Sequence, residues 1–116
     1  MADATIQLTE GSRHNVVLIV PNDISLTAYN AKIEVKTKET STTNLYTFST
    51  IDNSLIKNIS TISGSTVQQV LLQINASATE GKNGNYKWQL ILWSTVDDVI
   101  KFPIQNFIIK PSITTI

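Results

Sequence analysis

Few residues in this chain have the types and the spacing that catalysis or metal binding requires. His14 is the only histidine, and the sequence contains no cysteine. A nucleophilic triad or a zinc site would need that histidine together with suitably placed partners, and the sequence has neither an HExxH motif nor a pair of histidines. We therefore predict that His14 lies on a strand surface or in a turn.

Acidic and amide side chains occur together at two positions, but without the spacing of a cation site. Asp97-Asp98 and Asn22-Asp23 lack the alternating oxygen ligands of a DxDxDG calcium loop. The 4 glycines are scattered and form no phosphate-binding loop. The sequence thus predicts no catalytic residue, no metal and no cofactor, and an enzyme is the least favoured class.

The composition predicts one domain spanning residues 1–116 with little attraction to nucleic acid or membranes. The formal net charge is +0, and 41% of the residues are hydrophobic. A neutral protein has no long-range field toward phosphates or an anionic bilayer, and no apolar run approaches the ~20 residues of a membrane span. Met1–Ala4 lacks the basic and apolar regions of a signal peptide, so we expect synthesis in the cytoplasm. The zero net charge also weakens repulsion between copies, which favours association, with chance composition as the alternative explanation.

The stretch Gly84–Trp93 has the clearest pattern of a half-buried strand. Side chains of one parity are aromatic or aliphatic and those of the other are polar: Tyr86, Trp88, Leu90 and Leu92 against Lys87 and Gln89. Successive side chains of a strand point to opposite faces, so the first set is expected to face the core. We predict that this stretch is the central strand of a small all-β domain.

Other segments with alternating or β-branched residues, bounded by turn residues, predict further strands: 5–9, 13–20, 31–38, 45–51, 67–74 and 99–110. The apolar run Val16–Val20 predicts a strand covered on both faces. Residues 55–62 fit a strand or an ordered loop, and residues 76–82 could hold a helical turn. Pro103 predicts that the last strand is an edge strand, bulged or broken. The candidate core residues of that strand are Phe102, Ile104 and Ile108.

These elements predict an all-β fold, an antiparallel sandwich of about seven to nine strands. The segment Gly84–Trp88 resembles the Gly-x-Tyr-x-Cys signature near strand F of immunoglobulin domains, with Trp88 in place of the cysteine. The resemblance implies an immunoglobulin-like sandwich, in which the Tyr86 hydroxyl reaches back to upstream backbone as a tyrosine corner.

A second likeness covers most of the chain and is carried by Gly11 with the strand after it and by these segments: Asn22–Thr27, Ala31–Lys38, Val70–Ile74, Ala76–Thr79, Gly84–Trp88 and Ile108–Thr114. In this series the chain resembles immunoglobulin-like virion domains of tailed bacteriophages, such as the N-terminal domains of baseplate upper proteins and some small capsid auxiliary proteins. The resemblance implies a non-enzymatic virion structural protein, a decoration protein that binds the capsid surface in many copies.

The expected partners are viral structural proteins, either the major capsid protein or tail and baseplate proteins. One alternative is a tail or baseplate adaptor. Another is a carbohydrate- or receptor-binding module of the same fold, which would bind glycans through Tyr29, Tyr46 and Trp93.

Trp93 has the opposite parity to Trp88, so it is expected on the outer face unless a bulge intervenes or that face is also covered. An exposed tryptophan is a typical anchor of a protein contact. The loops Pro21-Asn22-Asp23 and Thr40–Asn44 and the two chain ends are the other places where we expect contacts. The candidate contact residues are Trp93, Pro21, Asn22, Asp23, Thr40, Asn44, Ile113 and Ile116.

Overall fold

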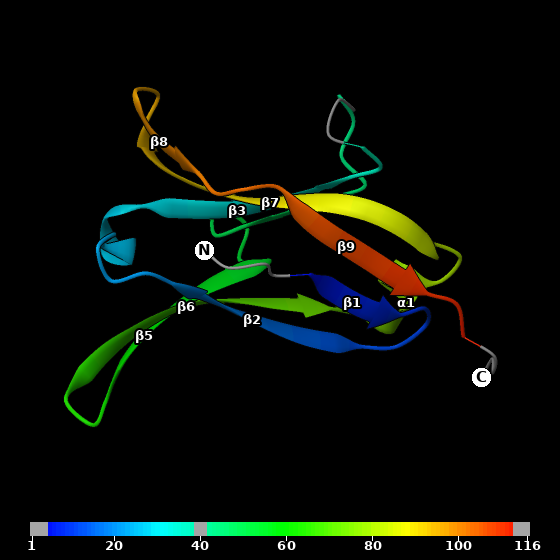
Figure 1. Ribbon diagram of the computed structural model, residues 1–116, viewed down its shortest axis with the longest axis horizontal. Coiled ribbons are helices and arrows are strands. Elements are labelled where there is room, and N and C mark those ends of the chain that lie inside the picture. Colours follow the sequence, from blue (N-terminus) through cyan, green and yellow to red (C-terminus); the bar gives the residue numbers. More distant parts are fainter. Residues whose placement is uncertain (1–4, 39–41, 113–116) are drawn as a thin grey trace.

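The computed structural model describes residues 5–38 and 42–112, in which nine strands form two stacked β-sheets (Figure 1). The larger sheet has the order β1-β9-β7-β3-β4, with β8 also beside β7, and the smaller sheet has the order β2-β6-β5. The larger sheet consists of β1 (Ile6–Thr9), β3 (Asn30–Lys36), β4 (Tyr46–Ser49), β7 (Gly84–Thr95), β8 (Asp98–Lys101) and β9 (Gln105–Lys110). The smaller sheet consists of β2 (His14–Val20), β5 (Leu55–Ile62) and β6 (Ser65–Ile74).

This order is that of an immunoglobulin-like sandwich. In that fold, strands B, E and D form one sheet with A, whereas C, F and G form the other. Here β2, β6 and β5 take the places of B, E and D, and β9, β7 and β3 take those of G, F and C. The predicted fold class is therefore confirmed. One pairing differs from an all-antiparallel sandwich, because β1 runs parallel to β9 instead of pairing with β2.

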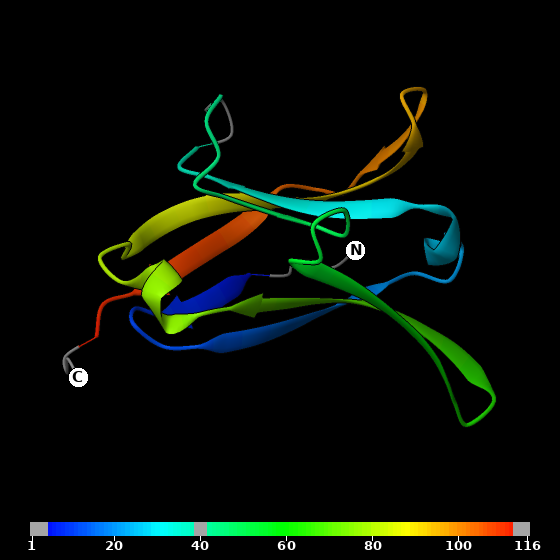
Figure 2. The same cartoon turned by 180° about the vertical axis from the view of Figure 1, so that it is seen from behind.

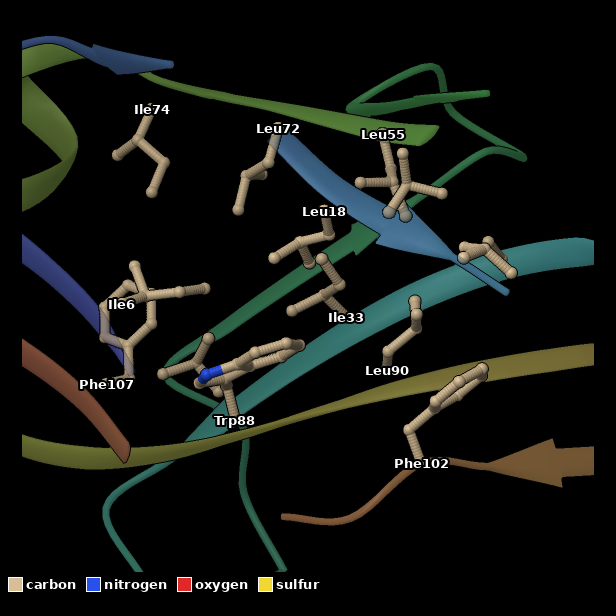
Figure 3. Close-up of a cluster of buried hydrophobic side chains, with 14 of the residues drawn as sticks. Ile6, Leu18, Ile33, Leu55, Leu72, Ile74, Trp88, Leu90, Phe102 and Phe107 are labelled. Atoms are coloured by element: carbon tan, nitrogen blue, oxygen red, sulfur yellow. The ribbon is translucent and has the colours of Figure 1, made fainter. Parts of the chain in front are cut away.

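The core lies between the sheets and consists of the side chains of each strand that point inward. β7 is a central strand, as predicted, and pairs with β3, β8 and β9. Trp88 of β7 is 1% exposed and lies among Leu18 and Leu72 of the smaller sheet and Ile33 and Phe107 of the larger one (Figure 3). Apolar side chains from both sheets thus point toward one another around Trp88.

The turns and short helices follow the sequence signals. Ser63 and Gly64 have positive φ angles of 51° and 79°, which suit the two-residue hairpin between β5 and β6. A helical turn, α1 (Ala76–Thr79), lies within the predicted segment, and residues 55–62 form a strand. The Tyr86 hydroxyl donates a hydrogen bond to the Lys82 carbonyl oxygen at 2.6 Å, so the predicted tyrosine corner is present.

The expectation that β2 is covered on both faces is wrong. Val17 and Ile19 are 50% and 63% exposed, and the strand alternates between buried and exposed residues. The outward parity of β2 points away from the larger sheet, and in the described part of the chain no third layer covers it. The apolar run Val16–Val20 therefore has one face in the core and the other exposed to solvent.

The core assignment of the last strand is wrong at Ile104 and Ile108. Phe102 is buried as expected, but Ile104 is 42% exposed and Ile108 is half-buried on the outer parity, whereas Phe107 and Ile109 are buried. The register on either side of Pro103 explains why the buried face switches. Trp88 pairs with Gln105, and Ile91 pairs with Lys101. Between them β7 has two residues and the other strand has three, and this one extra residue at Pro103 reverses the faces. Pro103 thus breaks the strand into β8 and β9, one of the predicted outcomes.

Candidate interaction surfaces

Two β-hairpins project beyond the body of the sandwich at the same end (Figures 1 and 2). The pairing of β2 with β6 ends at Val20 and Gln68, so the tip of the β5–β6 hairpin extends past β2. The pairing of β3 with β7 ends at Asn30 and Trp93, so the tip of the β7–β8 hairpin extends past β3. The segment 21–29, which contains the 3-10 helix η1 (Leu26–Ala28), connects the sheets between them. We call these two tips and this segment the hairpin end.

A buried glutamine fixes the connecting segment to the smaller sheet. Gln68 of β6 is 6% exposed, and its Oε1 accepts a hydrogen bond from the Leu26 N–H at 2.8 Å. Its Nε2 donates to the carbonyl oxygens of Ile24 at 2.6 Å and Pro21 at 3.2 Å. One side chain therefore binds three backbone groups of a loop, of which the Pro21 carbonyl oxygen also accepts a hydrogen bond from the Ile24 N–H.

A carboxylate links the same segment to the other hairpin. The Tyr29 hydroxyl donates to Asp98 Oδ1 at 3.1 Å, and the Ser94 hydroxyl donates to Asp98 Oδ2 at 2.6 Å. The hydrogen bond to Asp98 raises the pKa of Tyr29, because the neutral hydroxyl is the form that donates. The connecting segment is thus hydrogen-bonded to both hairpins.

The tips themselves carry exposed apolar side chains. Val96 lies in the β7–β8 turn and is 92% exposed, and Val99 beside it is 43% exposed. On the other hairpin, Ile62 is 58% exposed. These side chains lie at the hairpin tips and are exposed, so they contribute little to the core.

Trp93 lies on the outer face of the larger sheet at the base of the β7–β8 hairpin. The bulge in β7 comes after Trp93, between the pairs Trp93–Val99 and Thr95–Asp98, so it does not turn this side chain inward. The ring is half-buried, and the Lys32 Nζ lies 5.6 Å from its centroid. Trp93 therefore presents part of a ring with a cation above it, a geometry that stabilises by about 0.5–1 kcal/mol at exposed sites.

The other predicted contact residues separate into two groups. Pro21, Asn22 and Asp23 are exposed at the hairpin end, where the Asn22 Nδ2 donates to the Thr66 carbonyl oxygen at 2.8 Å. Asn44 is half-buried at the far end of β3, and its Nδ2 donates to the Thr47 Oγ1 at 2.8 Å. The structure thus places the first three residues at the hairpin end, beside the β5–β6 hairpin, but leaves Asn44 apart. Thr40, Ile113 and Ile116 lie outside the described residues.

The three aromatic residues considered for glycan binding do not form one platform. The Tyr46 ring packs against Phe48 and Phe107, and its hydroxyl donates to the Ala78 carbonyl oxygen. Tyr29 is engaged by Asp98 at the hairpin end, and Trp93 faces outward from the larger sheet. Tyr46 is therefore a structural residue.

The position of Tyr46 predicts a difference in alkaline stability. Burial, with a smaller effect of Tyr86, raises the pKa of Tyr46 above its ordinary value of 10.0. The pKa of Tyr46 is higher in the folded state than in the unfolded state. The neutral Tyr46 hydroxyl therefore contributes its full stabilisation below the unfolded pKa of about 10, and this stabilisation is lost as the pH rises through the raised pKa. We expect urea unfolding of the wild type to show a steeper fall in free energy above pH ~10 than unfolding of Tyr46→Phe. Equal slopes for the two proteins would contradict this assignment.

The outer faces of the two sheets differ in charge. Alternation places Lys32, Glu34 and Lys36 of β3 outward on the larger sheet, where the Lys32 Nζ and a Glu34 carboxylate oxygen are 3.4 Å apart. On the three described strands of the smaller sheet, no outward side chain is charged. These outward residues are Asn15, Val17, Ile19, Ile56, Asn58, Ser60, Ile62, Ser65, Val67, Gln69, Leu71 and Gln73.

His14 has a structural environment. It begins β2, and its Nε2 accepts a hydrogen bond from the Thr9 N–H at 3.0 Å, which closes the connection from β1. Its predicted place on a strand surface is confirmed. Among residues 5–38 and 42–112, no three histidine or acidic side chains are grouped to hold a metal ion. In the same residues, no helix has the length and apolar character of a membrane span.

Sequence reasoning missed Gln68 and the exposed face of β2. The signal for Gln68 was present, since it has the inward parity of Val70, Leu72 and Ile74 on the same strand. A glutamine on the buried side of an alternating strand must find hydrogen-bond partners. Its partners, however, come from a segment more than 40 residues earlier in the chain, which no local pattern indicates.

No protein-family model matches the sequence, and no curated protein matches it. One solved structure that resembles the chain is the second immunoglobulin domain of the mouse polymeric immunoglobulin receptor. The two share 10% sequence identity over 96% of this chain and 97% of that one, with a TM-score of 0.46.

Proposed function

We propose that this chain is a non-enzymatic structural protein of a tailed bacteriophage particle, which binds the capsid surface in many copies as a decoration protein. The sequence segments that resemble phage virion domains support this class of protein. In this role the protein is made in the host cytoplasm, becomes part of the virion and needs no cofactor. The major capsid protein is its partner.

The hairpin end is the observation that carries the proposal. It combines an apolar tip, Val96, with a connecting segment that Gln68 and Asp98 hold in place. A surface that is already ordered loses little conformational entropy on binding, so even a small contact yields a net gain. Many copies on one particle allow weak single contacts to persist.

Binding to particles should depend on the Val96 tip. We expect the purified chain to sediment with particles of its phage that lack it, and Val96→Asp to bind at least tenfold more weakly, because a charge there must be desolvated. Ile104→Asp is the matched control, since Ile104 is exposed away from this end on the larger sheet. Binding is measured by co-sedimentation in a sucrose gradient with quantification of the chain in the particle fraction.

The same experiment separates the related proposals. Sedimentation with isolated tails instead of tail-free capsids would favour a tail or baseplate adaptor. A chain that stays at the top of the gradient with both would contradict a virion role. Binding of the isolated chain to a glycan array, lost in Trp93→Ala, would favour the carbohydrate-binding alternative, which half-exposed Trp93 supports.

A further inference from the structure

The outer face of the smaller sheet combines apolar rows with amide side chains. Register places Val17, Leu71 and Ile56 side by side across the three strands as one apolar row. Amide pairs flank this row, with Gln73 Nε2 donating to Asn15 Oδ1 at 3.2 Å and Asn58 Nδ2 donating to Gln69 Oε1 at 3.3 Å. Depletion of charged side chains is a feature of the centre of protein interfaces.

The apolar row lies in a hollow, and a protruding side chain stands next to it. The hollow has a volume of about 560 Å³, and Val17, Ile56 and Leu71 line it together with polar residues that include Asn15 and Gln73. Ile19 is 63% exposed and lies two residues further along β2, on the same face. Two residues along a strand span roughly 6.6 Å, so the protrusion and the hollow are neighbours.

We propose that two copies of this chain associate face to face through the outer faces of their smaller sheets, with Ile19 of each copy entering the hollow of the other. A two-fold axis lying in the plane between the two faces satisfies both contacts at once, because such an interface uses the same patch on both subunits. The contact is independent of the proposed function, since the Val96 tip belongs to the larger sheet.

Charge favours a second copy as the occupant. The outward residues of the smaller sheet carry no charge, so two such faces meet without repulsion and without burying an unpaired ion. Each amide has two N–H donors and an acceptor oxygen, so one cross-strand hydrogen bond leaves capacity for an amide of the opposite copy. A strongly charged partner surface would instead lose hydration against this face and gain no counter-charge.

The area of the face determines how tightly two copies are expected to associate. The three strands are 7, 8 and 10 residues long. At roughly 3.3 Å per residue and about 4.8 Å between strands, they cover about 400 Å² on each copy, or about 800 Å² buried in total. That area lies below the standard range for specific complexes, which indicates a weak, reversible dimer. We therefore expect the association to depend on protein concentration in the micromolar range.

Sedimentation velocity of the isolated chain between about 5 and 500 µM tests the proposal directly. The expected mass rises with concentration from 12.8 kDa toward twice that value. Ile19→Asp and Ile56→Lys, each at a position that is more than half exposed, should keep the chain monomeric, with unchanged circular dichroism. Ile104→Asp, on the larger sheet, should dimerise like the wild type.

Mixing the two charged variants gives the sharpest result. In the proposed geometry residue 19 of one copy faces residue 56 of the other, so an equimolar mixture of Ile19→Asp and Ile56→Lys should regain a dimer that neither variant forms alone. A wild-type chain that stays monomeric throughout the concentration range overturns the proposal. A dimer that Ile104→Asp abolishes and Ile19→Asp leaves intact overturns it as well.

Discussion

Trp88→Ala is expected to remove about 3–5 kcal/mol from the free energy of unfolding, the usual range for truncating a buried large aromatic side chain. Domains of this size are stable by roughly 5–15 kcal/mol, so the substitution should remove between about a fifth and all of the stability. The effect is large because Trp88 is 1% exposed and its side chain lies between the two sheets (Figure 3). Its loss leaves a cavity that residues of both sheets line and that strands fixed by hydrogen bonds cannot close.

Trp93→Ala is the matched control, because it removes the same side chain from the same strand. Trp93 is half-buried on the outer face, so no internal cavity results, and the expected loss is about 1 kcal/mol, of the size of the cation–π contact with Lys32. Urea unfolding followed by far-ultraviolet circular dichroism measures both variants without relying on tryptophan fluorescence. Equal losses for the two variants would show that Trp88 does not join the sheets.

Alternation predicted the buried side of β3 and most of the burial in β7, although Ile91 on the outward side of β7 is also only 6% exposed. In β3 and β7 the inward parity is almost fully buried, with Ile33, Val35 and Leu90 each 0% exposed. The rule failed after Pro103, because one additional residue opposite β7 exchanged the two faces. Sequence indicates that proline interrupts the ladder, but whether the interruption contains an even or odd number of extra residues depends on the partner strand.

The exposure of β2 could not be read from the sequence for a different reason. A continuous apolar run is equally consistent with a strand covered on both faces and with one whose outer face awaits a partner. The choice depends on which elements lie above the sheet, which is a property of the whole topology. The predicted contact residues ended up in different places for the same reason. Local sequence patterns locate turns, but they do not show which turns lie together in the fold. Asp23 and Asn44 are both in predicted loops, yet only Asp23 is at the hairpin end.

Gln68→Leu is expected to lower the free energy of unfolding by about 2–4 kcal/mol, although leucine has a similar size and is more hydrophobic. The gain from burying leucine is outweighed because the Leu26 N–H and the Ile24 carbonyl oxygen lose the partner that Gln68 supplies, and the Pro21 carbonyl oxygen keeps only the Ile24 N–H. The damage should concentrate in the connecting segment, since β6 keeps its backbone pairing with β2 and β5.

Amide hydrogen exchange distinguishes this local effect from general destabilisation. Residues 24–28 of Gln68→Leu should exchange at least tenfold faster than in the wild type, at a temperature where β3 and β7 keep their protection. Gln7→Leu, at an exposed position on β1, is the control. It should change neither the free energy of unfolding nor the exchange rate of residues 24–28. Because the connecting segment orders the hairpin end, Gln68→Leu should also weaken particle binding while leaving Val96 itself intact. Unchanged exchange at residues 24–28 would show that Gln68 does not hold this segment, and would remove the basis for a preordered contact surface.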